Sequence, residues 1–109
     1  MKIGEILVRV PHKVKKGKII KILSLTRHPM DTGLIKNPKT GKKIPKWIIY
    51  KVNIFYDKRL ITTCHYGIGI AANPFLAFYL KADKKAPLEF VMYDTKGNIY
   101  KKAVIINAV

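Results

Sequence analysis

The sequence predicts an all-β fold, a β-sandwich of about seven antiparallel strands. Two observations predict it: runs rich in branched and aromatic residues recur along the chain, and turn signals separate them every 8–12 residues or so. No segment has a convincing helical pattern. The length of 109 residues suits one domain, so we expect a single domain over residues 1–109, without internal repeats.

The first two expected strands span residues 5–10 and 18–26. Pro11 closes the first strand, because proline cannot donate a hydrogen bond to a sheet. Gly17 lies in the lysine-rich turn before the second strand. The alternation of the second strand breaks near Leu23 and Leu25, which indicates a bulge or burial on both faces.

The third expected strand spans residues 47–56, and a tight turn at Asp57 and Lys58 leads into the fourth, residues 59–66. Successive side chains of a strand point to opposite faces. The face of the third strand that we predict to be buried carries Ile48, Tyr50, Val52, Ile54 and Tyr56.

Three more strands are expected at residues 75–82, 87–94 and 99–107. A glycine-rich connection, GIGIAANP, precedes the first of them, and the turn DTKGN separates the last two. Gly97 can adopt the left-handed conformation that this turn requires. A closed barrel and a two-sheet sandwich both fit seven such strands, and we favour the sandwich.

The formal net charge is +16, and 19 of the 22 basic residues are lysine. Such a charge favours anionic partners, including nucleic acid and acidic proteins. Half of the basic residues lie between Lys13 and Lys46. However, no RNA-recognition or zinc-finger signature is present, and lysine is a poorer reader of base edges than arginine. We therefore keep a basic nucleic-acid-binding β-domain as the alternative and expect no specific nucleic-acid partner.

The residues that could perform catalysis or bind metal are few. The three histidines, His12, His28 and His65, match no compact zinc spacing with Cys64. Cys64 and His65 are neighbours on a strand and so should face opposite ways. No phosphate-binding glycine motif and no pair of catalytic carboxylates occur. We predict no catalytic residue, no cofactor and no metal, although an iron or zinc enzyme using the histidines stays open.

No apolar run approaches the roughly 20 residues that span a bilayer. The N-terminal stretch, MKIGEILVRVPHKVKKGK, also has no apolar signal core of adequate length. The simplest location is the cytoplasm, and no membrane partner is expected. A protein can nevertheless be carried across a membrane by a partner that has the signal.

Three motifs occur in order along the chain: HPMDTG at 28–33, KNPKTGKKIPKWII at 36–49 and AANPF at 71–75. Together they resemble the SoxZ family, and the resemblance runs nearly end to end. It implies an immunoglobulin-like sandwich that is not itself an enzyme. The family pairs with SoxY, whose flexible C-terminal arm ends in a glycine-flanked cysteine that holds sulfur during thiosulfate oxidation. Phe75 stands where the family usually has tyrosine, and the lysine content is unusually high.

The resemblance also implies partners and a location. We expect a heterodimer with a SoxY-like subunit, transient contacts with other sulfur-oxidation enzymes, and export to the periplasm with the signal-bearing partner. The exposed edge strands also allow the isolated chain to self-associate. The residues that we predict for the partner interface are His28, Pro29, Met30, Asp31, Gly33, Asn73 and Pro74.

Overall fold

The structure is a computed structural model that describes residues 2–109, and it confirms the predicted all-β sandwich. Its seven strands all pair antiparallel. The bounds differ from the predicted ones by at most two residues at either end. The strands are β1 (Ile6–Arg9), β2 (Lys18–Thr26), β3 (Ile49–Tyr56), β4 (Arg59–His65), β5 (Phe75–Ala82), β6 (Ala86–Asp94) and β7 (Ile99–Ile106).

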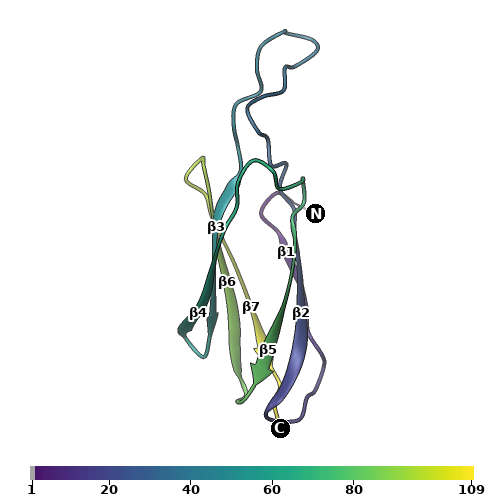
Figure 1. The fold of residues 1–109 in the computed structure, drawn as a ribbon, viewed down its shortest axis with the longest axis vertical. Coiled ribbons are helices and arrows are strands. Elements are labelled where there is room, and N and C mark those ends of the chain that lie inside the picture. Colours follow the sequence, from purple (N-terminus) through teal and green to yellow (C-terminus); the bar gives the residue numbers. More distant parts are fainter. Residues whose placement is uncertain (1) are drawn as a thin grey trace.

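The strands form two sheets that pack face to face, as Figure 1 shows. One sheet has the order β1-β2-β5 and the other the order β4-β3-β6-β7. The core between them is apolar, and its largest fully buried side chain is Phe90, which packs against Phe78 of the other sheet. Alternating burial along β6 is regular from end to end, as expected for a central strand with one face on the core.

The predicted burial of Tyr50 is wrong. Its side chain is 42% exposed, whereas Ile49 is fully buried. The register between β3 and β6 shifts between Ile49 and Lys51, so Tyr50 is an extra residue in the ladder. Such a bulge reverses the alternation for the residues on one side of it. The other four predicted core residues of this segment are buried.

The irregularity that the sequence indicated in β2 is of a different kind. The register of β2 with both neighbours is unbroken, so β2 has no bulge. Instead, the polar residues Ser24 and Thr26 point into the core, while Leu23 is half-buried and Leu25 exposed on the outer face. The chemical pattern is therefore inverted over the last four residues of this strand.

Residues 34–46 form a protruding hairpin, which we call the finger. In Figure 1 it projects beyond the end of the sandwich, along the longest dimension of 56 Å. A bridge between Lys36 and Lys43 holds its two sides together, and the N–H of Ile44 donates to the carbonyl of Ile35 at 2.8 Å. Gly41, with φ of +70°, makes the turn at its tip.

Candidate functional site

The first and third motifs meet at the end of the sandwich from which the finger projects. The N–H of His28 donates to Oδ1 of Asn73 at 3.1 Å, and the N–H of Asn73 donates to the carbonyl of His28 at 2.7 Å. Asn73 has a φ of +51°, a left-handed conformation that asparagine tolerates better than most residues. The pair ties the end of β2 to the start of β5.

The His28 side chain is completely buried and has both ring nitrogens engaged. The backbone N–H of Met30 donates to Nδ1 at 3.1 Å, so that nitrogen carries no proton. The proton of the neutral ring is then on Nε2, which lies 3.4 Å from Oδ2 of Asp94. Burial lowers the pKa of His28 below its ordinary value, although the Asp94 carboxylate opposes that shift.

Asp94, at the end of β6, accepts hydrogen bonds from several directions. The indole N–H of Trp47 donates to Oδ2 at 2.7 Å, and the hydroxyl of Tyr100 and the side-chain amide of Asn98 donate to the same oxygen. The backbone N–H groups of Lys96 and Asn98 donate to Oδ1, both at 2.9 Å. Burial alone would raise the pKa of this carboxyl, but the hydrogen bonds outweigh it and hold the pKa well below its usual range.

Side chains around Asp94 also make aromatic and cation–π contacts with one another. The rings of His28 and Trp47 meet edge to face with centroids 5.0 Å apart, and the Lys96 ammonium lies 3.8 Å from the centre of the Trp47 ring. Burial, with the bond to Asp94, raises the pKa of Tyr100 to about 12. We call His28, Trp47, Asp94, Asn98 and Tyr100 the polar hub. It is a structural cluster, because the buried polar side-chain atoms of His28 and Asp94 all have hydrogen-bond partners within the fold.

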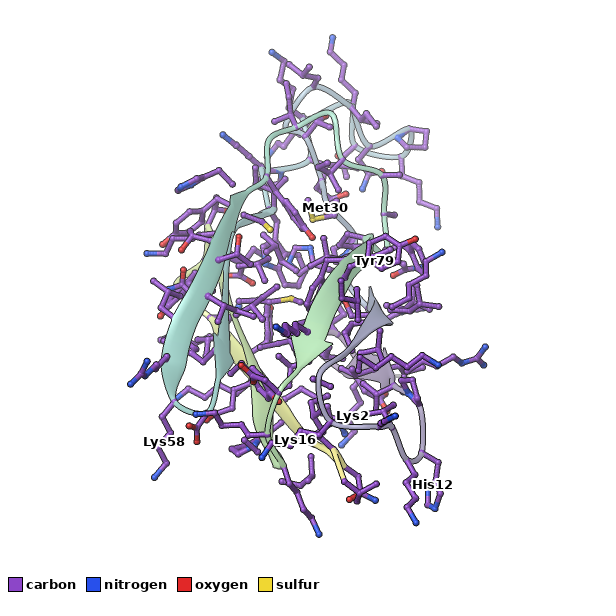
Figure 2. All side chains as sticks on the ribbon, turned by 60° about the horizontal axis from the view of Figure 1, so that its bottom comes forward. Lys2, His12, Lys16, Met30, Lys58 and Tyr79 are labelled. Atoms are coloured by element: carbon purple, nitrogen blue, oxygen red, sulfur yellow. The ribbon has the colours of Figure 1, made fainter. Side chains whose placement is uncertain are left out.

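The seven residues predicted for a partner interface fall into a buried, an exposed and a half-exposed set. The side chains of His28, Met30 and Pro74 are buried, so they shape this end of the molecule rather than present themselves on it. Figure 2 shows Met30 pointing into the molecule beneath the loops. Asn73 is exposed. The remaining three predicted residues, Pro29, Asp31 and Gly33, are half-exposed. Their use by a partner stays a prediction.

Sequence reasoning missed Asp94, Trp47 and Tyr100 as site residues. The one signal that could have found Asp94 is its position: a lone carboxylate that ends a strand and begins the DTKGN turn. Trp47, the only tryptophan, lies within the second motif, two residues after Pro45. Nothing local predicts that these residues meet His28, because their contact depends on the pairing of distant strands.

The histidines and Cys64 do not converge. His28 lies in the polar hub, whereas His12 is exposed on the β1–β2 connection, close to Asn107. Cys64 is the penultimate residue of β4 and pairs with Val52 of β3, and its side chain is half-buried. Among residues 2–109, no group of three histidine, cysteine or acidic side chains is placed to hold a metal ion.

Two surfaces with exposed side chains lie near this end of the sandwich, and the outer face of the other sheet also exposes Ile99 and Ile105. The outer face of the β1-β2-β5 sheet carries exposed apolar side chains, including Leu7, Leu25 and Phe75. The finger carries five lysines, and its stem exposes Leu34 and Ile35. Figure 2 shows nitrogen-tipped side chains pointing outward around the whole molecule. Within residues 2–109, no helix is long and apolar enough to cross a membrane.

The two-sheet sandwich, closed at one end by the polar hub, defines an immunoglobulin-like β-domain. The family model described as "Sulphur oxidation protein SoxZ" matches residues 8–104. This match covers most of the chain, so the chain belongs to the SoxZ family. Membership implies a role in the carrier complex of the Sox sulfur-oxidation system. Among curated protein sequences, none gives a significant match.

Solved structures support the fold. A superoxide reductase (neelaredoxin) from Ignicoccus hospitalis has a TM-score of 0.73 and 15% sequence identity, over 95% of this chain and 80% of that one. The sulfur carrier protein SoxY from Chlorobium limicola f thiosulfatophilum has a TM-score of 0.65 and 12% identity, over 94% of this chain and 74% of that one. At these identities the likeness establishes the immunoglobulin-like fold alone.

Proposed function

We propose that this chain is the non-catalytic subunit of a heterodimeric sulfur carrier. It binds a SoxY-like subunit whose C-terminal cysteine carries the sulfur intermediate during thiosulfate oxidation. The observation that carries this proposal is the match to the SoxZ family over residues 8–104. The complex works in the periplasm, which this chain reaches together with its signal-bearing partner.

The position of Cys64 supports this division of labour. A carrier thiol has to travel between the active sites of several enzymes. Cys64 lies within β4, where the backbone pairs along its length with β3, and its side chain is half-buried. A sulfur group attached there could not swing. The cysteine that carries sulfur therefore belongs to the partner.

The end of the sandwich around the polar hub fits a scaffolding role. His28 and Asn73 lock two loops together, and the hub fixes both to the end of β6. The exposed parts of this end, Asn73 and the half-exposed turn at Asp31 to Gly33, can then meet the partner without rearranging. We keep the seven predicted residues as the interface proposal, with His28 and Met30 acting from inside.

The finger suits the transient partners of the carrier, the other sulfur-oxidation enzymes. Its lysines have no carboxylate within salt-bridge distance in the described residues, because the two ion pairs there are His28–Asp94 and Lys84–Asp57. Unpaired cations on a protruding element speed encounter with acidic surfaces. Replacing Lys39, Lys42 and Lys43 by serine should slow association with those enzymes at low salt, and leave the heterodimer intact. Equal association rates at low salt would refute this assignment.

The direct test is to purify the chain from its native source and weigh every co-eluting chain by intact mass spectrometry. We expect one stoichiometric partner that ends in a glycine-flanked cysteine, with part of it carrying additional sulfur mass. A chain that elutes without such a partner would overturn the proposal. Co-elution with nucleic acid that survives physiological salt would instead support the alternative of a basic nucleic-acid-binding domain.

A further inference from the structure

The outer face of the β1-β2-β5 sheet carries apolar side chains in register. Leu7 of β1, Leu25 of β2 and Phe75 of β5 lie directly opposite one another and form one row across all three strands. The next row holds Leu23 and Ala77, with Arg9 at its β1 end. We call these two rows the apolar rows. Phe75 is 62% exposed, and its register with Leu25 and Leu7 makes the exposed apolar surface contiguous across the three strands.

The inverted pattern of β2 indicates that the outer face, which carries the apolar rows, is covered by another molecule. Ser24 is buried on the core side, and its hydroxyl oxygen has no hydrogen-bond partner in the structure. At the same time Leu23 and Leu25 lie on the outer side. A strand that faced water on this side would be more stable with the leucines inside and the serine outside. The arrangement is favourable when the outer side is covered as well.

The apolar rows also surround a hollow of about 390 Å³, large enough to receive a side chain from another protein. Five of its seven lining residues are apolar, and the set is Leu7, Val8, Arg9, Leu23, Ser24, Leu25 and Phe75. Hollows of this kind, an apolar floor beside one cation, hold the anchoring residues of protein interfaces. The rows are continuous with the predicted interface, since Phe75 directly follows Asn73 and Pro74.

The charge around the rows selects the occupant. Arg9, Lys21 and Lys81 stand on the same outer face, all exposed, and no described carboxylate pairs with any of them. A second copy of this chain would bring the same cations and its own net charge of +16 against them. The complementary partner has apolar side chains at the centre and carboxylates at the rim.

We propose that the apolar rows are the surface on which the SoxY-like subunit docks, with an apolar side chain of that subunit in the hollow and a carboxylate on Arg9. This inference rests on the proposed function, because it takes the partner from it. It goes further by assigning the centre of the interface to a sheet face. The end loops at Asp31 and Asn73 then form the rim of the same contact.

The test measures the affinity of the SoxY-like subunit, obtained by the co-purification above and expressed separately, for three variants by isothermal titration calorimetry. Phe75→Glu puts a charge at the centre of the rows, and Arg9→Glu reverses the rim charge. Ile99→Glu is the matched control, because Ile99 is similarly exposed, at 55%, but lies on the outer face of the other sheet. All three positions are exposed, so folding should be preserved, and thermal melts verify it.

We expect Phe75→Glu to weaken binding by roughly 30-fold or more, as for a central interface residue, and Arg9→Glu by about tenfold with a changed salt dependence. Ile99→Glu should change affinity by less than about threefold. If the wild-type chain does not bind the subunit, the proposed function fails. If it binds and the Phe75 and Arg9 variants bind equally well, or if only the Ile99 variant loses affinity, the proposed function stands and the apolar rows are not the interface.

Discussion

Replacing Asp94 by asparagine tests whether one carboxylate holds the end of the sandwich together. The two side chains have the same shape, but asparagine has only one oxygen. If its nitrogen takes the place of Oδ2, it faces the N–H groups of Trp47 and His28, and His28 cannot reverse its role while Nδ1 accepts from Met30. If the nitrogen takes the place of Oδ1, it faces two backbone N–H groups.

In either orientation, two buried or partly buried donors that cannot become acceptors lose their partner. Each lost partner costs about 1–3 kcal/mol. Asparagine avoids the cost of burying a charge, which offsets part of this loss. We therefore expect the free energy of unfolding to fall by about 2–4 kcal/mol, out of roughly 5–15 kcal/mol for a typical domain.

Urea unfolding followed by tryptophan fluorescence is the appropriate assay, because Trp47 is the only tryptophan and bonds directly to Asp94. Asp57→Asn is the control: this carboxylate is exposed, pairs only with Lys84, and should leave the midpoint unchanged within error. A loss of less than about 1 kcal/mol for Asp94→Asn would refute the reasoning, since it would mean that the donors find other partners.

The wild-type chain should also lose stability in acid for the same reason. The pKa of Asp94 is lower in the folded chain than in the unfolded one, so its contribution is complete above the unfolded value of about 4 and declines as pH falls below it. The Asp94→Asn variant should show a shallower decline over that range. Parallel acid titrations of the two proteins would contradict the assignment.

Three further predictions concern the same end of the molecule. Because the pKa of His28 is lowered in the folded chain, the melting temperature should fall as pH drops below about 6.5. His28→Gln should remove this pH dependence. If the variant keeps the same pH dependence, His28 is not buried as a neutral ring. His28→Ala should weaken the heterodimer by loosening the loop that bears Asp31, which calorimetry with the partner measures, and unaltered affinity would exclude an indirect role. Gly4→Ala should destabilise the chain by more than about 2 kcal/mol, because its Cβ would lie 2.2 Å from the Tyr100 ring at a φ of +89°. Gly41→Ala is the control: Gly41 has a φ of +70° and no atom near its Cβ position, so the variant should cost about 1 kcal/mol. Equal melting temperatures of the two variants would refute the steric argument.

The strands could be predicted from the sequence because their signals are local. Alternation and turn residues located all seven, and the family motifs pointed to the correct sandwich. The exposed Tyr50 could not be predicted, since the bulge beside it is a property of the pairing between β3 and β6. The inversion in β2 could be seen in the sequence only as a broken alternation. Whether Ser24 or Leu25 faces the core depends on how β2 pairs with the other strands of its sheet.

The candidate site shows the same limit more strongly. Its motif residues were found, but not the contacts that give them their roles. The sequence predicts that His28 is a loop residue. Its environment, however, is set by Trp47, just before β3, and Asp94, at the end of β6, which are both distant from it along the chain. The burial of each motif residue is known only once both sheets are assembled. That burial decides whether the residue can touch a partner directly or can only support the surface from inside.

The open face of the three-stranded sheet has a consequence for how the cell must supply this chain. Under the docking proposed above, the apolar rows are covered only in the complex, so the subunit is exposed to proteases and chaperones until its partner is made. Synthesis of the two subunits in equal amounts would then leave the least of this chain uncovered. A cell that lacks the partner should degrade this chain rather than accumulate it, so its steady-state level reports the abundance of the complex.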